Sequence, residues 1–181
     1  EDGEDVPRDD ETIGEVVVRG NQVMEGYWEQ PEATEAAFSE RAEGYYHMGD
    51  LATVDENGMI AVQDRKKDII VTGGENVSSI ELEDTLFEHP AVSSVAVVPA
   101  PSDRWGEEPK AFVVPESGDP DAPEVTAEEL IEFTRERLAG FKSLKRVEFV
   151  DTLPTTATGK VQKYELRAQE WEDEERMIGE G

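Results

Sequence analysis

The sequence predicts an α+β protein in two parts, and three observations indicate this fold class. Short strand-like segments with little helix occupy residues 1–63, whereas strands and helices alternate from residue 68 onward. Apolar residues make up 36% of the 181-residue chain and gather in these segments, so the chain is expected to fold despite its acidity. Three short strands are too few to close a core, and we therefore interpret residues 1–63 as the end of a larger β-rich domain.

The first part is expected to contain three strands and one short helix. Thr12–Gly20 (TIGEVVVRG) is typical of a short strand, and a helical run starts at Glu32. Leu51–Val54 and Met59–Gln63 alternate between apolar and polar residues, and the turn between them contains Asn57-Gly58. Because Asn-Gly supplies the positive φ that a tight turn requires, these two segments are predicted to pair as a hairpin.

The second part, residues 68–181, is predicted to be a compact domain of alternating strands and helices. Ser79 is expected to cap the first helix, and Thr126 opens the second with a capping box to Glu129. Pro, Gly and charged residues predict loops at 100–109 and 115–123. In chain order the predicted elements are a strand at 68–72, a helix at 79–88, strands at 92–99 and 110–114, a helix from 126 to about 139, a strand at 146–150 and a helix from 163 to about 177.

The charge balance excludes several classes of function. Lys and Arg number 17 against 44 Asp and Glu, for a formal net charge of −27, and such a chain repels nucleic acid and anionic membranes. There is no Cys, and His47 and His89 lie far apart in the sequence, so neither a disulfide nor a metal site is expected. No apolar run approaches the roughly 18 residues of a membrane span, and we expect a cytoplasmic protein.

The acidic residues are spread along the whole chain, and two interpretations of them stay open. They can form a surface that binds a partner, or they can suit the protein to a salt-rich cytoplasm. At 1 M salt the Debye length is only about 3 Å, which screens the self-repulsion of such a surface. We favour the second interpretation, which points to a halophile and predicts that the protein loses structure at low salt.

The basic residues are clustered instead. Nine of the 17 fall within residues 65–67 and 141–167, which indicates either an anion site or a set of surface ion pairs. The second stretch contains the loop Leu153–Lys160 (LPTTATGK), which ends in Gly-Lys but lacks the spacing of a phosphate-binding P-loop. Such a loop can present one ammonium to charge that develops on a carboxylate or phosphoryl oxygen, or it can be a solvent-exposed turn.

Five motifs occur in an order and at a spacing that resemble those of one enzyme family. They are GEVVVRG with MEGYW and PEAT (14–34), GYYHMGDLA (44–52), DRKKDIIVTGGENVSSIELED (64–84), DRWGEEPKAFVV (103–114) and LPTTATGKVQKYELR (153–167). Together they resemble the C-terminal third of the acyl- and aryl-CoA synthetases, which are adenylate-forming enzymes. The resemblance is strongest to the fatty-acyl and aryl-CoA ligase branches. It implies the family fold, with the end of the large domain in residues 1–63, a hinge at 64–67 and a mobile lid domain at 68–181.

The resemblance implies nucleotide-binding roles for two residues of the first part. Asp50 of the MGD motif matches the aspartate that binds the ribose hydroxyls of ATP, and Arg65 matches an arginine that approaches the same ribose. Met48 departs from the family, which usually has Thr at this position. Trp105 also lies near these motifs, and packing is a better interpretation of it than stacking on the nucleotide.

Four further residues have implied roles in the movement and the chemistry. Lys67 matches the hinge about which the C-terminal domain rotates. Lys160 matches the lysine that stabilises the transition state when the substrate carboxylate attacks the α-phosphate. Gly73 and Gly74 match the loop that lines the pantetheine tunnel after rotation, where missing side chains permit close approach of the backbone.

The implied activity is that of an AMP-forming acid–thiol ligase. Its substrates would be a small-molecule carboxylic acid, ATP and CoA, and its products acyl-CoA, AMP and pyrophosphate, formed through an acyl-adenylate. The Mg²⁺ ion and the acid would be held mainly by the preceding N-terminal domain of the same enzyme. Two alternatives stay open: a non-catalytic remnant or binding module that needs a separate large domain, and an adenylation domain that loads a carrier protein.

Overall fold

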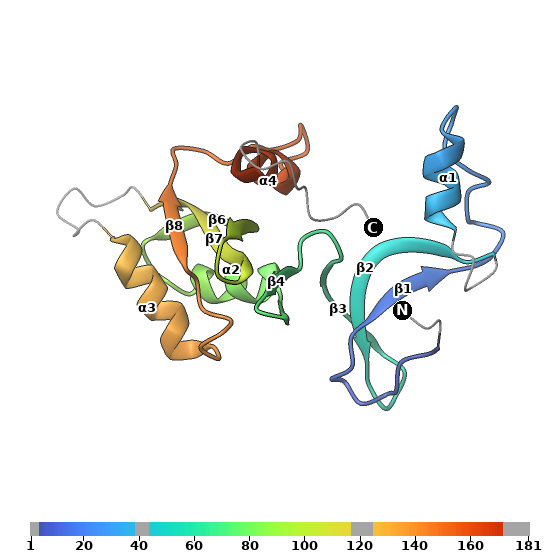
Figure 1. The fold of residues 1–181 in the computed structure, drawn as a ribbon, viewed down its shortest axis with the longest axis horizontal. Helices are drawn as coiled ribbons and strands as arrows, with labels where there is room; N and C mark the ends of the chain where they lie inside the picture. Colours follow the sequence, from blue (N-terminus) through green and yellow to red (C-terminus); the bar gives the residue numbers. More distant parts are fainter. Residues whose placement is uncertain (1–3, 39–43, 117–124, 172–181) are drawn as a thin grey trace. The chain divides into compact units, whose positions relative to one another are not determined.

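The structure is a computed structural model that describes residues 4–38, 44–116 and 125–171. The chain divides into two compact units, Glu1–Lys67 and Asp68–Gly181, here called the first and the second unit (Figure 1). Helices and strands occur in both units, so the predicted α+β class is confirmed.

Among the described residues, the first unit forms a three-stranded antiparallel sheet in the order β1-β2-β3. Its elements are β1 (Gly14–Val18), α1 (Pro31–Ala37), β2 (Tyr46–Val54) and β3 (Ile60–Arg65). The predicted hairpin between β2 and β3 is confirmed, and Asp55 Oδ1 accepts hydrogen bonds from the amides of Asn57 and Met59 at 2.9 and 2.7 Å. β2 starts earlier than predicted because Tyr46 and His47 pair with β1.

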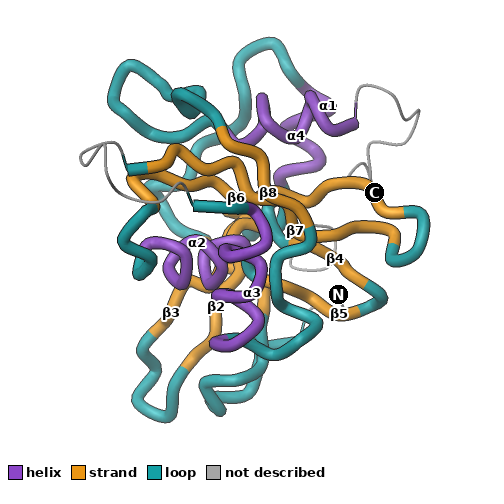
Figure 2. Tube along the Cα trace, turned by 90° about the vertical axis from the view of Figure 1, so that its left-hand side faces the viewer, coloured by secondary structure: helices purple, strands orange, loops and turns teal. Residues whose placement is uncertain are grey.

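The second unit is a mixed sheet that carries helices. The strand order is β5-β4-β7-β6, and β8 runs parallel to β7. Figure 2 shows the strands in orange and the helices in purple. The strands are β4 (Ile70–Thr72), β5 (Glu75–Val77), β6 (Val92–Ser102), β7 (Gly106–Pro115) and β8 (Arg146–Phe149). The helices are α2 (Ser79–Phe87), α3 (Ala127–Arg137) and α4 (Lys163–Trp171). The predicted helix end near residue 177 and most of the predicted loop at 115–123 lie outside the described residues.

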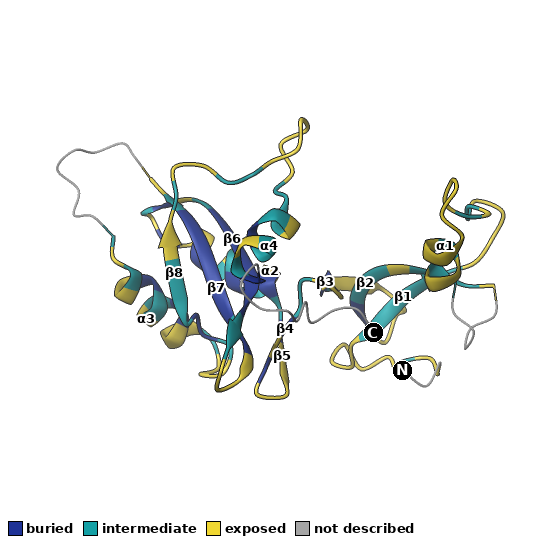
Figure 3. Ribbon diagram, turned by 45° about the horizontal axis from the view of Figure 1, so that its top comes forward, coloured by how far each residue is buried: buried dark blue, intermediate teal, exposed yellow. Residues whose placement is uncertain are grey.

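The core of the second unit lies on both faces of β6 and β7, whose middle portions are buried (Figure 3). Successive side chains of a strand point to opposite faces. Val95 and Val97 therefore join the cluster that contains the buried leucines of α2 and α3, whereas Ala96 and Val98 pack with Leu166 of α4. Burial on both faces explains why β6 is a continuous apolar run in the sequence. It also fixes α4 to the sheet directly after the loop that carries Lys160.

The loop predicted at 100–109 is wrong, because most of these residues belong to strands. Residues 99–102 pair with residues 106–109 and lengthen the β6–β7 hairpin, which leaves residues 103–105 as the turn. Pro101 favoured a loop because proline cannot donate a ladder hydrogen bond, whereas Pro99 was already part of the predicted strand at 92–99. β6 lies at the end of the strand order, and such an edge position tolerates the missing donors.

The predicted cap of α2 is displaced by one residue. Ser78, not Ser79, is the N-cap, and its hydroxyl accepts a hydrogen bond from the amide of Glu81 at 3.2 Å. The predicted cap of α3 is confirmed, since Thr126 accepts the corresponding bond from the amide of Glu129 at 3.2 Å. Two adjacent serines offer the same chemistry, and the packing of the helix decides which of them caps it.

Candidate functional site

Asp50 and Arg65 lie side by side at one edge of the first unit. They are register partners on β2 and β3, and the Arg65 Nε is 3.6 Å from the Asp50 Oδ1. Both side chains remain accessible, with 29% of the Asp50 and 59% of the Arg65 side chain exposed. An exposed pair of this kind adds little stability. The pair therefore presents a carboxylate acceptor and a guanidinium donor together at an open edge.

A wide bulge in β2 carries Asp50. Glu15 of β1 pairs with Leu51, whereas Val17 pairs with His47. One β1 residue thus faces three β2 residues, Met48, Gly49 and Asp50. Gly49 has φ +73° with no neighbour within 4 Å of the position of a Cβ, so its backbone conformation rather than a lack of space favours glycine. The bulge removes Asp50 from the β1–β2 ladder, and Asp50 remains opposite Arg65 in the β2–β3 ladder.

Glu15, His47 and Lys66 adjoin this bulge. The sequence had not indicated a role for these three side chains. The Glu15 Oε2 accepts hydrogen bonds from the His47 Nδ1 at 3.0 Å and from the Lys66 Nζ at 3.2 Å. Burial by itself would raise the pKa of Glu15, but the hydrogen bonds from His47 and Lys66 outweigh it and hold the pKa below its ordinary value. No local motif reveals this cluster, because its members come from three different strands or their ends.

Gly73 and Gly74 form the turn between β4 and β5 in the second unit. The amide of Gly73 donates to the carbonyl of Trp105 at 3.0 Å, and a Cβ on Gly73, where φ is +60°, would lie 3.0 Å from Trp105 Cε3. Gly74 has φ +90° and open space around it. Trp105 thus packs against Gly73, as expected of it, while 43% of it stays exposed and Arg104 lies over its ring. The turn is accessible to a ligand at Gly74 but is filled by tryptophan at Gly73.

Lys160 ends a closed turn before α4. The amide of Thr156 donates to the carbonyl of Lys160 at 2.8 Å, and the Thr156 Oγ1 accepts a hydrogen bond from the Lys160 amide at 3.1 Å. A bridge between Thr155 and Val161 closes the base of the turn. Gly159, with φ +84°, turns the chain directly before the lysine. The backbone of Lys160 is thereby held in place, and its side chain is exposed to solvent.

The other basic residues of the 141–167 segment have partners. Lys142 pairs with Glu81 and Lys163 with Glu83, each at 2.7 Å, and Arg146 pairs with Glu108 at 2.9 Å; Arg167 pairs with Asp68, and Lys145 donates to Ser143 and to the carbonyl of Gly140. Within the described residues, the Lys160 ammonium has no hydrogen-bond or ion-pair partner. Most of the basic cluster is therefore a set of ion pairs, and Lys160 is the cation left for a ligand.

The candidate residues fall into two groups. Asp50, Arg65 and Lys67 belong to the first unit, and Lys67 is its last residue, whereas the glycines and Lys160 belong to the second unit. Over residues 4–38, 44–116 and 125–171, no cluster of three or more His, Asp or Glu side chains could hold a metal ion. A search of the same residues finds no helix long and apolar enough to cross a membrane.

Comparison with known proteins identifies the second unit. Residues 81–160, a span that ends on Lys160, match the family model of the AMP-binding enzyme C-terminal domain. Over these residues, the second unit carries an AMP-binding enzyme C-terminal domain. Over 165 residues, or 91% of its length, the chain is 48% identical to acetate–CoA ligase CCL3 of Humulus lupulus and 47% identical to a feruloyl-CoA synthase of Amycolatopsis.

The similarity to AMP-binding enzymes extends over both units and into the fold. The structure matches the ATP-bound crystal structure of MatB from Rhodopseudomonas palustris with a TM-score of 0.80 and 36% identity, over 93% of this chain and 32% of that one. The chain spans 28% of the length of the Humulus lupulus ligase and 32% of the length of the feruloyl-CoA synthase. The matched length corresponds to the C-terminal third that the motifs predicted.

Proposed function

We propose that this chain is the C-terminal part of an AMP-forming acyl-CoA synthetase. The reaction would join a carboxylic acid to the α-phosphate of ATP with release of pyrophosphate, and CoA would then displace AMP from the acyl-adenylate. The first unit would contribute to the nucleotide site, and the second would be the mobile lid. The relatives act on different acids, as acetate and feruloyl in their names state, so the class of acid stays open.

The observation that carries this proposal is the state of Lys160. It stands at the end of a closed turn, exposed and without a partner within the described residues, while its basic neighbours are held in ion pairs. A rigidly held backbone with a free ammonium suits the stabilisation of charge that develops at the α-phosphate during attack. We assign Lys160 this catalytic role.

Asp50 and Arg65 would hold the ribose of the nucleotide. A carboxylate can accept hydrogen bonds from both vicinal hydroxyls, and the neighbouring guanidinium can orient that carboxylate. The exposure of both side chains leaves them accessible to the hydroxyls of a ligand. The match to an enzyme whose structure was solved with ATP bound supports the use of ATP by the longer protein.

The second half-reaction would use the lid in another position. Lys67 would be the pivot, because it ends the first unit and Asp68 begins the second. Rotation would withdraw Lys160 and bring the turn at Gly73 and Gly74 to the pantetheine arm of CoA, with the open space at Gly74 as the point of closest approach. Mg²⁺ would offset phosphate charge when bound, but the described residues offer no ligand cluster for it.

The test of the proposal separates the two half-reactions in the longer ligase that contains this segment. Lys160→Ala should lower the rate of acyl-adenylate formation by at least about 10²-fold, since that is the loss for removal of one such stabilising group. The same variant should still form thioester from supplied acyl-adenylate and CoA. Lys142→Ala, which removes a lysine of the same segment that is paired with Glu81, is the matched control. Equal loss of both half-reactions in Lys160→Ala would contradict the assignment.

Two other functions stay as alternatives to CoA ligation. A carrier protein in place of CoA would require thioester formation on a phosphopantetheinyl protein and none on free CoA, which the same assay measures. A non-catalytic module would bind a separate large domain without either reaction. The cytoplasmic location and the salt-adapted surface stay predictions from the composition.

A further inference from the structure

The bulge that carries Asp50 needs an external constraint. Its three residues face a single residue of β1, so they lack regular ladder hydrogen bonds to β1. β1 alone therefore does not hold the bulge in one conformation. On the other side, Asp50 stays in register with Arg65 of β3, and the amide of Lys66 donates to the carbonyl of Gly49 at 2.8 Å. The Lys66 amide is therefore one of the two backbone constraints on the bulge from the side of β3.

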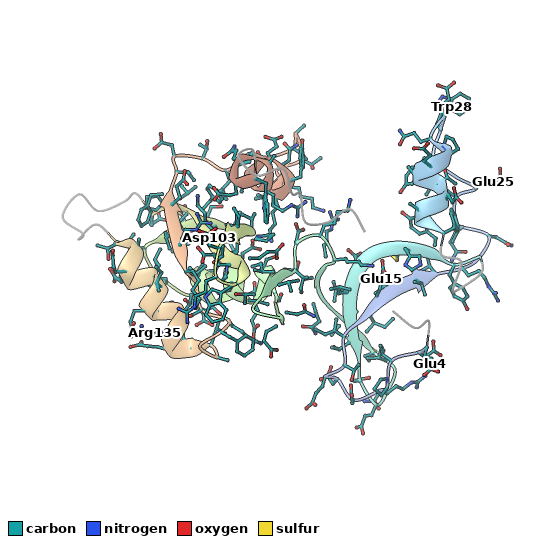
Figure 4. The ribbon with its side chains drawn as sticks, in the orientation of Figure 1. Glu4, Glu15, Glu25, Trp28, Asp103 and Arg135 are labelled. Carbon is teal, nitrogen blue, oxygen red and sulfur yellow. The ribbon has the colours of Figure 1, made fainter. Side chains whose placement is uncertain are left out.

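Glu15 fixes Lys66 from the opposite edge of the sheet. Its Oε2 receives the Lys66 ammonium at 3.2 Å and the His47 Nδ1 at 3.0 Å. His47 precedes the bulge and Lys66 follows Arg65, so a single carboxylate oxygen joins the chain segments on both sides of the nucleotide residues. Figure 4 labels Glu15 on β1, beside the curve of β2. Hydrogen bonds to a charged acceptor are stronger and shorter than neutral ones, which suits a positioning contact.

The burial of Glu15 argues that the contact has a specific purpose. Only 18% of its side chain is exposed, in a chain with 44 acidic residues, most of which need no partner at the surface. Burial of a carboxylate is unfavourable unless cations and donors compensate it. Here both compensating groups are neighbours of the nucleotide residues, and Lys66 is also the residue before the proposed pivot Lys67.

We propose that Glu15 is a positioning residue of the nucleotide site, which clamps His47 and Lys66 across the bulge so that Asp50 and Arg65 face the ribose. This inference rests on the proposed function for its catalytic consequence. Its structural content, that Glu15 holds the Lys66–Gly49 contact, is independent of any reaction.

The first experiment uses the 181-residue chain and measures amide hydrogen exchange by NMR. Glu15→Gln keeps the shape of the side chain and removes its charge, and it should speed exchange of the Lys66 amide about tenfold or more, while the amides of the β2–β3 hairpin near Asp55 keep their protection. Lys66→Met should release the Gly49 contact in the same way without a change in β1. Glu56→Gln, at an exposed position in the turn between β2 and β3, is the control. Unchanged protection of the Lys66 amide in Glu15→Gln would overturn the proposed clamp. If Glu15→Gln does not fold, the exchange of the same amide in Lys66→Met decides the question.

The second experiment uses the longer ligase and measures ATP–pyrophosphate exchange. Glu15→Gln should raise the KM for ATP about tenfold with little change in the KM for the acid, because misplacement of Asp50 and Arg65 affects the nucleotide alone. A loss confined to kcat would indicate a merely structural role and would overturn the inference. If the parent ligase forms no acyl-adenylate, the proposed function fails, but the exchange experiment still tests the clamp.

Discussion

Lys110 offers a sharp test of how this acidic domain is stabilised. It lies in the middle of β7 with 8% of its surface exposed. Its Nζ is 2.7 Å from the Glu148 Oε2 of β8 and 2.5 Å from the Glu170 Oε1 of α4, and it lies over the ring of Phe112. A buried lysine thus joins the sheet to the helix that follows the Lys160 turn.

The effect of Lys110→Met can be worked from these contacts. The methionine keeps the apolar stem, so the loss is electrostatic. Glu148 is half exposed, and its pair with Lys110 contributes less than about 1 kcal/mol. Glu170 is 12% exposed, and removal of one partner of a buried pair costs about 3–5 kcal/mol. Arg146 lies 3.7 Å from the other oxygen of Glu170 and offsets part of this cost, which places the expected destabilisation near 3 kcal/mol.

Urea unfolding followed by tryptophan fluorescence measures this loss. Trp171 reports on the region, because it is buried and its Nε1 donates to the carbonyl of Pro99. With a slope of about 2 kcal/mol/M, the midpoint of Lys110→Met should fall by about 1.5 M urea, and the loss should persist at about 1 M salt. Arg135→Met, which breaks an exposed pair with Glu132 within α3, should shift the midpoint by less than about 0.5 M. Equal shifts in the two variants would refute the reasoning.

Three further predictions concern pH, a turn and salt. Burial raises the pKa of Glu107, and it outweighs the hydrogen bond from the Val71 amide and the charge of Arg167, both of which lower that pKa. Since the folded state then binds this proton more tightly than the unfolded state, wild type should gain stability relative to Glu107→Gln as the pH falls from about 7 toward about 4, and urea unfolding of both at each pH checks the sign. Gly73→Ala should cost about 1–3 kcal/mol and alter the Trp105 fluorescence, because its Cβ meets that ring, whereas Gly74→Ala should leave the fluorescence unchanged. Circular dichroism should show loss of structure when salt is lowered from about 2 M to tens of millimolar, and melting curves that do not depend on salt would contradict the salt-adapted surface.

Local signals in the sequence predicted local structure well. The Asn57-Gly58 turn and the cap by Thr126 each act within a few residues, and both are confirmed. The loop predicted at 100–109 failed because the edge position of β6, which makes its prolines acceptable, depends on the order of strands across the whole sheet. The same limit applies to the site. The motif that contains Asp50 was visible, but the bulge that shapes it depends on the register between β1 and β2, which no single segment encodes.

The pairing of the basic residues sharpens the case for Lys160. A chain with 17 basic and 44 acidic residues has more than two acidic residues for each basic one. Four basic residues of the 141–167 segment each pair with a carboxylate from a distant part of the chain, namely Lys142, Lys163, Arg146 and Arg167. An unpaired lysine is therefore not the default outcome in this protein. The Thr156–Lys160 turn holds its own backbone through main-chain and threonine contacts, none of which neutralises the ammonium. A lysine that has no partner among the described residues, in such acidic surroundings, is better explained by a ligand that brings the negative charge than by chance.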